Sequence, residues 1–415
     1  MCDEVFGNHN FIAQIVWEKV HTRKNSAIYF SGSHEYVLCY AKHKRTSNQD
    51  KEGFIRNLLP REDTSAYTNP DNDPKGPWKP DPITAHNYYS ADYSIQKPDG
   101  TIIERPQDRY WAFSEETWNR LVKEKAVIWG AGSSMPMVKR YLCDVQDGLV
   151  PITLFSREFA GDTSSAKKRI DDILEHKGIF EYTKPIKLLQ KLMLIATKKN
   201  DIVLDFFSGS ASTADALLSL SAEENKGNRK FIMVQLPEET DEKSEAFKAG
   251  YKNICEIGKE RIRRAGKRIL EEHPELAGKL DIGFRVLKVD STNMQDVYYQ
   301  PAEITQTELF TLADNIKPDR TPEDLLFQVM LDLGILLSSK IEETTIGGKR
   351  VFNVAEGYLL ACFDSNVTGE VITEIAKQQP YYAVFRDSSL ASDSVAANFE
   401  QIFATYSPST ERKVL

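Results

Sequence analysis

The sequence has few cysteines, no long apolar run and no charged-then-apolar segment at its start. Its five cysteines are scattered, and none forms a Cys-x-x-Cys pair. Single thiols of this kind are typical of reduced, mostly buried side chains, and they argue against a disulfide framework or a zinc site. The sequence also has no membrane-spanning run and no leader, which argues against a membrane or secreted protein. We therefore expect a soluble cytoplasmic protein with no membrane contact and no metal site.

Basic residues are scarce in the last part of the chain. The 415 residues carry 61 acidic and 53 basic side chains, which gives a net charge of −8. Residues 301–415 hold 17 acidic and 9 basic side chains, so the first 300 residues hold 44 of each and are neutral. DNA binding needs basic stretches in the right region more than a basic total, and the first 300 residues contain them. The length predicts two or three domains.

Residues 201–213, Asp-Ile-Val-Leu-Asp-Phe-Phe-Ser-Gly-Ser-Ala-Ser-Thr, have the pattern of a cofactor site. Ile202–Leu204 is a short apolar run that predicts a buried parallel strand. A turn of small residues follows, and then a helix from Ala214. A second strand is predicted over Lys230–Leu236, where Gln235 can reach a ribose. A strand, a small-residue turn and a helix N-terminus together predict a cofactor site at the carboxyl end of a parallel strand.

This stretch resembles the first cofactor motif of the amino-methyltransferases that act on DNA, Asp-Phe-Phe-x-Gly-Ser-Gly-Thr-Thr. Ala211 stands where that pattern has its second glycine. The segment from Phe180 to Leu189 resembles a second cofactor element of the family, Phe-x-x-x-Lys-Pro-x-x-Leu-Leu, and Pro185 is expected in the first turn of a helix. The resemblance implies S-adenosylmethionine as cofactor, bound by Lys184, Pro185, Asp205, Phe206, Phe207, Ser208, Gly209, Ser210, Ala211, Thr213 and Gln235.

The resemblance extends along the chain. Residues 30–38, Phe-Ser-Gly-Ser-His-Glu-Tyr-Val-Leu, resemble the end of the family's catalytic half, and we favour a structural over a catalytic role for His34. The order of the motifs is that of the permuted class, in which the catalytic motif comes first. Tyr382–Ser389 and Glu400–Phe403 resemble the tail of the modification subunit of type III restriction–modification systems.

This resemblance implies an α/β fold. We expect an incomplete Rossmann-like methyltransferase core that depends on S-adenosylmethionine, with an inserted target-recognition domain and a C-terminal α+β domain. Residues 1–45 are expected to be the back half of the catalytic part of the core, 46–165 the DNA-binding target-recognition region, 166–298 the cofactor-binding part and 299–415 the acidic C-terminal domain. We also expect a strand over 283–300, a linker over 300–319 and helices over 166–180, 256–268 and 323–337.

Residues 46–165 interleave aromatic and basic side chains, which suits nucleic acid. The alternative, that the aromatic residues form the core of a small loop-rich domain, is equally open. Gly130-Ala-Gly132 follows a short apolar strand, as in a dinucleotide fingerprint. Because the third glycine is absent and Pro136 follows, we favour a place in the recognition region. The predicted DNA contacts are Trp78, Arg109, Lys139 and Arg140.

The basic helix over 256–268 either contacts phosphate or presents a solvated face, and the second interpretation is favoured.

The resemblance implies methyl transfer from S-adenosylmethionine to the exocyclic amine of adenine at specific sites in double-stranded DNA. It also implies a homodimer that works with a restriction (helicase–nuclease) subunit. Two alternatives stay open. One is a DNA-recognition module without enzymatic activity that serves a restriction partner, and the other is a small-molecule enzyme with a doubly wound fold. The choice of adenine over cytosine rests partly on a motif that this sequence lacks.

That motif is Asp-Pro-Pro-Tyr, the family's catalytic sequence, which does not occur here. In the permuted order it precedes residue 1, so the resemblance implies the C-terminal part of a longer subunit, and no catalytic residue is assigned. We predict that the chain alone does not methylate DNA, because the amine of a flipped adenine needs the acceptors and stacking aromatic of this motif. Labelled S-adenosylmethionine and mixed-sequence duplex DNA should give no transfer; transfer at the rate of an intact family member would contradict this.

Overall fold

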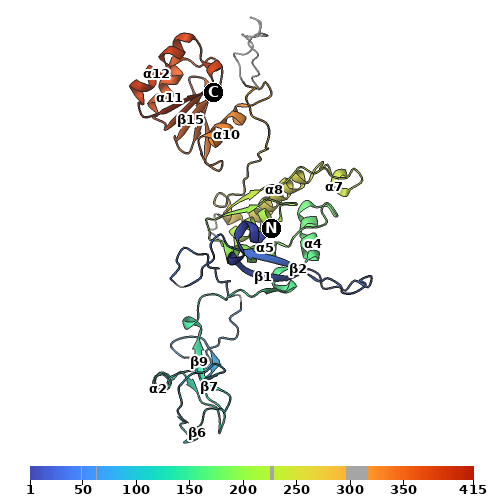
Figure 1. Cartoon of the computed structure of the whole chain (residues 1–415), viewed down its shortest axis with the longest axis vertical. Coiled ribbons are helices and arrows are strands. Elements are labelled where there is room, and N and C mark those ends of the chain that lie inside the picture. Colours follow the sequence, from blue (N-terminus) through green and yellow to red (C-terminus); the bar gives the residue numbers. More distant parts are fainter. Residues whose placement is uncertain (48, 62, 225–228, 296–315) are drawn as a thin grey trace. The chain divides into compact units, whose positions relative to one another are not determined.

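The computed structural model describes residues 1–47, 49–61, 63–224, 229–295 and 316–415, and the chain divides into two compact units (Figure 1). The first unit is Met1–Arg285 and the second is Val286–Leu415. The boundary expected between residues 298 and 299, and most of the linker expected over 300–319, lie outside the described residues. Across those described residues, no helix combines the length and apolarity needed to cross a bilayer.

The part of the first unit that carries the predicted cofactor residues alternates short strands with helices. Its strands are β1 (Phe11–Glu18), β2 (His34–Tyr40), β10 (Leu154–Phe155), β11 (Ile202–Asp205) and β12 (Lys230–Met233). Its helices are α1 (Cys2–Phe6), α3 (Arg157–Ala160), α4 (Thr163–Leu174), α5 (Ile186–Ala196), α6 (Ser212–Glu223), α7 (Glu245–Lys248) and α8 (Ile254–Glu272). β11 and β12 are parallel, and α6 follows the turn after β11, so the predicted strand, turn and helix are confirmed.

Helix α6 is the centre of this part of the chain. One side packs on α5 and β11 through Leu217 and Leu220, and another packs on α8 through Ala214 and Leu218. Buried polar groups usually have hydrogen-bond partners. The Ser221 hydroxyl of α6 has none among the described residues, but a buried charge is far more costly to leave unpaired. Because Asp215 lies on this helix with no exposed surface, its carboxylate needs partners from neighbouring elements.

The strands are covered on one face only, as far as the described residues show. Val203 packs against the α5 and α6 cluster, whereas Ile202 and Leu204 are 58% and 56% exposed. Successive side chains of a strand point to opposite faces, and the helices lie on the face of Val203. The prediction that all of Ile202–Leu204 is buried is therefore wrong for two of the three residues.

β1 forms the middle of a second sheet, antiparallel to β2 and parallel to β10. β2 contains the run Tyr36–Tyr40, whose first four residues alternate exposed and half-buried side chains. Trp17 on β1 is buried, and its indole Nε1 donates to the carbonyl oxygen of Gly161 over 2.8 Å. His34 opens β2 on the surface, with a ring nitrogen 3.0 Å from the Tyr36 hydroxyl.

The helices expected over 166–180 and 256–268 are confirmed, with different ends. α4 ends at Leu174 because Glu175 takes a left-handed conformation. α8 buries Ile257, Ile262 and Ala265 as expected. Pro185 is the N-cap of α5 and not a residue of its first turn, which corrects the predicted position by one residue.

The recognition region is rich in loops, as expected. Its strands are β3 (Trp78–Pro82), β4 (Thr84–Ala85), β5 (Ile95–Gln96), β6 (Ile102–Ile103), β7 (Tyr110–Trp111), β8 (Val127–Ile128) and β9 (Met137–Tyr141), and its helix is α2 (Glu115–Lys123). Trp111 and Trp118 are buried in a core with isoleucine and valine side chains, while Tyr88 is 77% exposed. The aromatic residues therefore divide between a core of this region and its surface.

The loop at Gly130 and Gly132 does not begin a nucleotide-binding unit. β8, which precedes it, is antiparallel to β9, which follows it. A dinucleotide fingerprint needs a helix after the glycine turn and a parallel strand beyond it. The dinucleotide interpretation is therefore wrong.

The second unit is a mixed sheet covered on both faces. Its elements are α10 (Pro322–Asp332), β13 (Ile341–Ile346), β14 (Lys349–Val354), β15 (Leu359–Cys362), α11 (Gly369–Lys377), β16 (Tyr382–Phe385), α12 (Asp393–Tyr406) and β17 (Glu411–Val414), with the strands in numerical order. Alternate residues of β15 face opposite layers, because Leu359 packs with α10 and Leu360 with α11 and α12. β13 and β17 were not predicted.

Two predictions near the start of this unit are wrong. Residues 283–290 form no strand, and Val289 is fully exposed; alternation of apolar residues gives a strand only where another strand pairs with it. Residues 291–295 also form no strand, with Met294 in an isolated bridge to Ile316, and residues 296–300 lie outside the described residues. The helix expected to reach residue 337 ends at Asp332, close to Gly334 with φ of +68°.

Candidate functional site

The turn after β11 is fastened by the carboxylate of Asp205. Its Oδ1 accepts from the backbone N–H of Phe207 over 3.2 Å, and its Oδ2 accepts from the Thr213 hydroxyl over 2.6 Å. The backbone of Asp205 accepts from the N–H of Val234, while the N–H of Ser208 donates to the carbonyl of Val234. One carboxylate and one neighbouring strand thus fix both sides of the turn.

Two residues of this turn have positive φ. Gly209 has φ of +52°, and its N–H donates to Oε1 of Gln235 over 2.7 Å. Ala211 has φ of +57° and is the N-cap of α6. The Ala211 methyl faces Gly258 of α8, where a Cβ would lie 3.4 Å away, so the core accommodates it. The left-handed conformation costs an alanine roughly 1–2 kcal/mol.

The N-terminus of α6 follows directly on the turn, and residues 210–214 around it are at most 7% exposed. No side chain caps the helix, and the first N–H groups of a helix have no partner within it. Phe206 and Phe207 beside the turn are 63% and 81% exposed, with ring centroids 5.2 Å apart. Unpaired donors next to exposed aromatic rings suit a ligand that has both anionic and apolar parts.

Thr183, which directly precedes Lys184 and Pro185, connects their segment to this turn. The hydroxyl of Thr183 lies 2.9 Å from that of Ser212, at the start of α6. The structure therefore brings together the two cofactor elements that the sequence separates.

The Lys184 side chain is held by β1 and β2. Its ammonium lies 2.6 Å from Oε2 of Glu35 and 5.2 Å from the Trp17 ring centroid. Hydrogen bonds from Lys184 and then from Lys19 lower the pKa of Glu35. The Glu35 carboxylate is thus kept ionised beside the cofactor elements.

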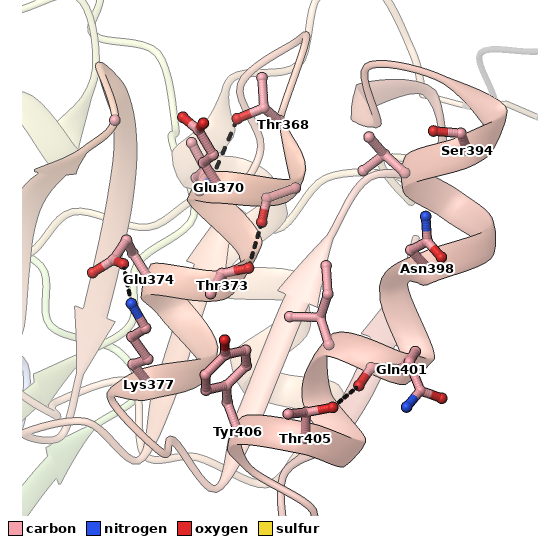
Figure 2. A pocket seen from close by; sticks show the side chains of 15 residues that line it. Thr368, Glu370, Thr373, Glu374, Lys377, Ser394, Asn398, Gln401, Thr405 and Tyr406 are labelled. Carbon is pink, nitrogen blue, oxygen red and sulfur yellow. Dashed lines mark hydrogen bonds and ion pairs between the residues drawn. The ribbon is translucent and has the colours of Figure 1, made fainter.

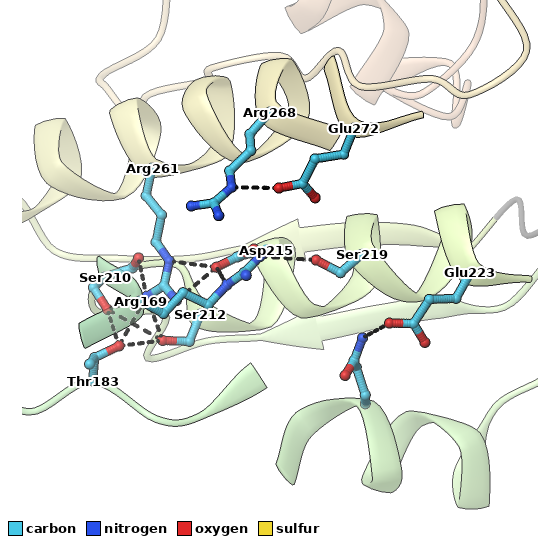
Figure 3. Close-up of polar contacts among 11 residues, drawn as sticks. Arg169, Thr183, Ser210, Ser212, Asp215, Ser219, Glu223, Arg261, Arg268 and Glu272 are labelled. Carbon is cyan, nitrogen blue, oxygen red and sulfur yellow. Dashed lines mark hydrogen bonds and ion pairs between the residues drawn. The ribbon is translucent and has the colours of Figure 1, made fainter. Parts of the chain in front are cut away.

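The sequence analysis missed a buried polar network behind the turn (Figure 3). Arg261 and Asp215 have no exposed surface and form an ion pair of 2.9 Å. Burial alone would raise the pKa of Asp215, but the hydrogen bond from Arg169 and the charges of both arginines hold its pKa below the usual value. The basic helix was expected to face phosphate or solvent, which is wrong for Arg261. A signal existed, because Arg261 shares the helix face of Ile257 and Ala265.

Three of the four predicted DNA contacts, Trp78, Lys139 and Arg140, lie on the paired strands β3 and β9, whereas Arg109 directly precedes β7. Lys139 is 8% exposed, and its ammonium lies 2.6 Å from Asp71 and 2.5 Å from Asp73. The hydrogen bond from Lys139 is the main cause that lowers the pKa of Asp73 to about 2, so this pair stays ionised near neutral pH. Arg140 is 51% exposed and lies 3.5 Å from Asp81.

The other two predicted contacts also have protein partners. The Nε1 of Trp78 donates to Asp71 over 2.9 Å, and Lys139 lies 5.2 Å from the ring centroid. Arg109 donates to the carbonyl of Thr84 over 3.0 Å and lies 2.8 Å from a ring nitrogen of His86. The Trp78 indole and the Lys139 ammonium thus share Asp71 as a partner.

The Gly130–Ser134 loop presents carbonyl oxygens inward. The ammonium of Lys97 donates to the carbonyls of Gly130, Gly132 and Ser134, over 2.6 Å at Gly132. A phosphate-binding turn presents N–H groups to an anion. This loop therefore has the wrong polarity for a phosphate, which agrees with its antiparallel strands.

A cavity of about 960 Å³ lies in the second unit, between α11 and α12 (Figure 2). Its polar groups are largely satisfied by neighbours: Thr373 donates to the carbonyl of Gly369, Thr405 to that of Gln401, and Lys377 pairs with Glu374. Ligand sites offer polar groups that converge on the ligand. The cavity contains none of the predicted site residues, and we assign it no role.

Comparison with known proteins gives a consistent family. A sequence model described as DNA methylase matches residues 1–263. The Mod subunit of the type III restriction-modification enzyme StyLTI of Salmonella typhimurium is 31% identical over 292 residues, which cover 69% of this chain and 42% of the relative. The EcoP15I Mod subunit of Escherichia coli is 27% identical, covering 96% and 63%, and the EcoPI Mod subunit of Escherichia phage P1 is 28% identical, covering 91% and 60%. The chain thus spans 42–63% of the length of these curated relatives.

The strain at Ala211 gives a stability prediction. Ala211→Gly removes a left-handed penalty of roughly 1–2 kcal/mol and adds an entropic cost of roughly 0.5–1 kcal/mol. Because Ala211→Gly also loses a buried methyl worth about 0.8 kcal/mol, the free energy of unfolding should change by about 1 kcal/mol or less. Ala216→Gly, inside α6, is the matched control and should lower it by about 1 kcal/mol or more. Denaturant unfolding measures both, and an equal loss in the two variants would contradict the assignment.

Proposed function

Because the chain belongs to the DNA methylase family, we propose that it carries the cofactor-binding and DNA-recognition parts of a site-specific DNA adenine methyltransferase. We place this enzyme in a type III restriction–modification system, as the names of three relatives suggest. The observation that carries the proposal is the meeting of the Lys184–Pro185 segment with the Asp205–Thr213 turn at the N-terminus of α6. Family membership implies the α/β fold of methyltransferases that use S-adenosylmethionine.

The residues of the turn fit S-adenosylmethionine, which supplies a methyl group on a sulfonium. The uncapped start of α6 suits its carboxylate. The exposed rings of Phe206 and Phe207 suit its adenine. We propose that the cofactor contacts are Lys184, Pro185, Asp205, Phe206, Phe207, Ser208, Gly209, Ser210, Ala211, Thr213 and Gln235.

We further propose how the chain is divided. Residues 1–45 and 166–298 form a Rossmann-like core, 46–165 form an inserted target-recognition domain, and 299–415 form an acidic α+β domain. The recognition domain binds double-stranded DNA through surface cations and exposed aromatic rings. A homodimer and a restriction subunit are the proposed protein partners, since the relatives are named as Mod subunits of restriction enzymes.

One alternative deserves a test. It is a DNA-recognition module without enzymatic activity that serves a restriction partner. Such a module would bind DNA without needing S-adenosylmethionine. The small-molecule alternative has lost its support, because the Gly130 loop presents carbonyls to Lys97.

Cofactor binding is tested at Gly209. In Gly209→Val a β-branched residue must take φ of +52°, and its side chain stands where the cofactor approaches the turn. We expect a loss of S-adenosylmethionine affinity of about tenfold or more, with at most about 1–2 kcal/mol lost in stability. Titration calorimetry measures the affinity, with Gly132→Val, which has the same φ of +52° and lies outside the proposed contacts, as the control variant that keeps it. Equal affinity in Gly209→Val and the unmodified chain would refute the site.

DNA binding is tested on β9 by comparing two neighbouring cations. Arg140→Ala should weaken binding to all sequences and reduce the salt slope by about one, because a half-exposed guanidinium can contact phosphate. Lys139→Ala should mainly lower the melting temperature of the chain, because its ammonium neutralises Asp71 and Asp73. Fluorescence anisotropy with labelled duplex DNA at several salt concentrations gives the comparison. A larger loss of DNA affinity in Lys139→Ala would reverse this assignment.

A further inference from the structure

Arg261 is a buried cation on α8, a helix that also carries exposed basic side chains. Its side chain has no exposed surface, whereas Lys267 and Arg268 on the same helix are 79% and 46% exposed. A buried guanidinium is tolerated only when its charge and its five N–H donors are matched. Asp215 supplies the charge, since its Oδ2 lies 2.9 Å from Nη2 and 3.1 Å from Nε of Arg261.

The other end of the guanidinium contacts three hydroxyls (Figure 3). Its Nη1 donates to Thr183 Oγ1 over 2.9 Å, to Ser212 Oγ over 2.9 Å and to Ser210 Oγ over 3.1 Å. The same three hydroxyls lie within 3.3 Å of one another. One cation therefore joins two segments that are far apart in the sequence.

One of these hydroxyls belongs to Ser210, itself a proposed cofactor contact, and the other two belong to direct neighbours of such contacts. Thr183 precedes Lys184, while Ser210 and Ser212 flank Ala211. Thr183 is 3% exposed, so it cannot itself offer much surface to a ligand. The hydroxyl group positions the backbone of its segment, and the neighbouring residues face outward.

Asp215 does not depend on Arg261 alone. Arg169 of α4 makes a bidentate contact with the same carboxylate, 2.9 Å from Nε and 2.6 Å from Nη2, and also reaches Ser219. The anion therefore keeps a cationic partner when Arg261 is replaced. This separates the two roles of Arg261, which are the pairing of Asp215 and the joining of the two segments.

We propose that Arg261 is a positioning residue for the cofactor, which holds the Thr183–Pro185 segment against the 209–213 turn. This inference rests on the cofactor site proposed above. Arg261 acts through hydroxyls and does not touch the cofactor, because it has no exposed surface. Arginine is required because a planar guanidinium can bond Asp215 on one side and the hydroxyls on the other, whereas an ammonium is a compact point charge.

Two variants and one control test this role. Arg261→Lys keeps the charge beside Asp215 and loses the fork that reaches the hydroxyls. Thr183→Val removes one hydroxyl and leaves the ion pair with Asp215 intact. Arg268→Met, on the same helix and paired with Glu272 on the surface, is the control.

Two measurements are made on each full-length variant. Amide hydrogen exchange without cofactor reports the order of residues 209–213, and titration calorimetry well below the melting temperature reports the Kd of S-adenosylmethionine. We expect Arg261→Lys and Thr183→Val to speed this exchange and to raise the Kd by about fivefold or more. Arg268→Met should change neither.

The outcomes separate this role from a structural one and from the proposed function. A merely structural role would move the melting temperature and leave exchange at residues 209–213 and the Kd unchanged below it. That result, or faster exchange with an unchanged Kd, would overturn the inference. If the unmodified chain binds no S-adenosylmethionine, the cofactor role fails together with the proposed function. In that case the exchange measurement still decides whether Arg261 joins the two segments.

Discussion

The carboxylate of Asp215, on the buried helix α6, has no exposed surface and must be paired within the protein. This need for partners arranges the centre of the first unit. An unpaired buried carboxylate is costly, and a partly satisfied one is worse than an apolar residue. Here α4 and α8 each contribute an arginine to it. The ion cluster therefore sets how three helices meet, in addition to their apolar contacts. It also places a guanidinium directly behind the turn that follows β11.

The same constraint explains why the turn can be irregular. Gly209 and Ala211 take left-handed conformations, and such backbone persists only where its surroundings define it strongly. Asp205 bonds one side of the turn, Gln235 bonds the N–H of Gly209, and Arg261 holds Ser210 and Ser212 from behind. These contacts leave the first N–H groups of α6 without a side-chain cap. A prearranged set of donors of this kind binds a ligand with little further ordering cost.

The sequence predicted local patterns well and tertiary partners poorly. The strand, turn and helix of residues 202–220 were correct because apolar runs, small residues and helical spacing are local signals. The strand over 283–300 was wrong because alternation does not reveal whether a partner strand exists. Arg261 and Lys139 were taken for surface cations, since a charge run does not show which member faces the core. Lys139 proved to be enclosed by two aspartates that lie 66 and 68 residues earlier.

The central claim is that S-adenosylmethionine binds at the turn between β11 and α6. Ultraviolet cross-linking of the radiolabelled cofactor to the intact chain, followed by peptide mapping, locates it without any substitution. We expect the label in peptides that contain residues 180–189, 202–213 or 230–238, and competition by unlabelled cofactor should remove it. Competable label confined to the second unit, for example beside the cavity between α11 and α12, would contradict the account.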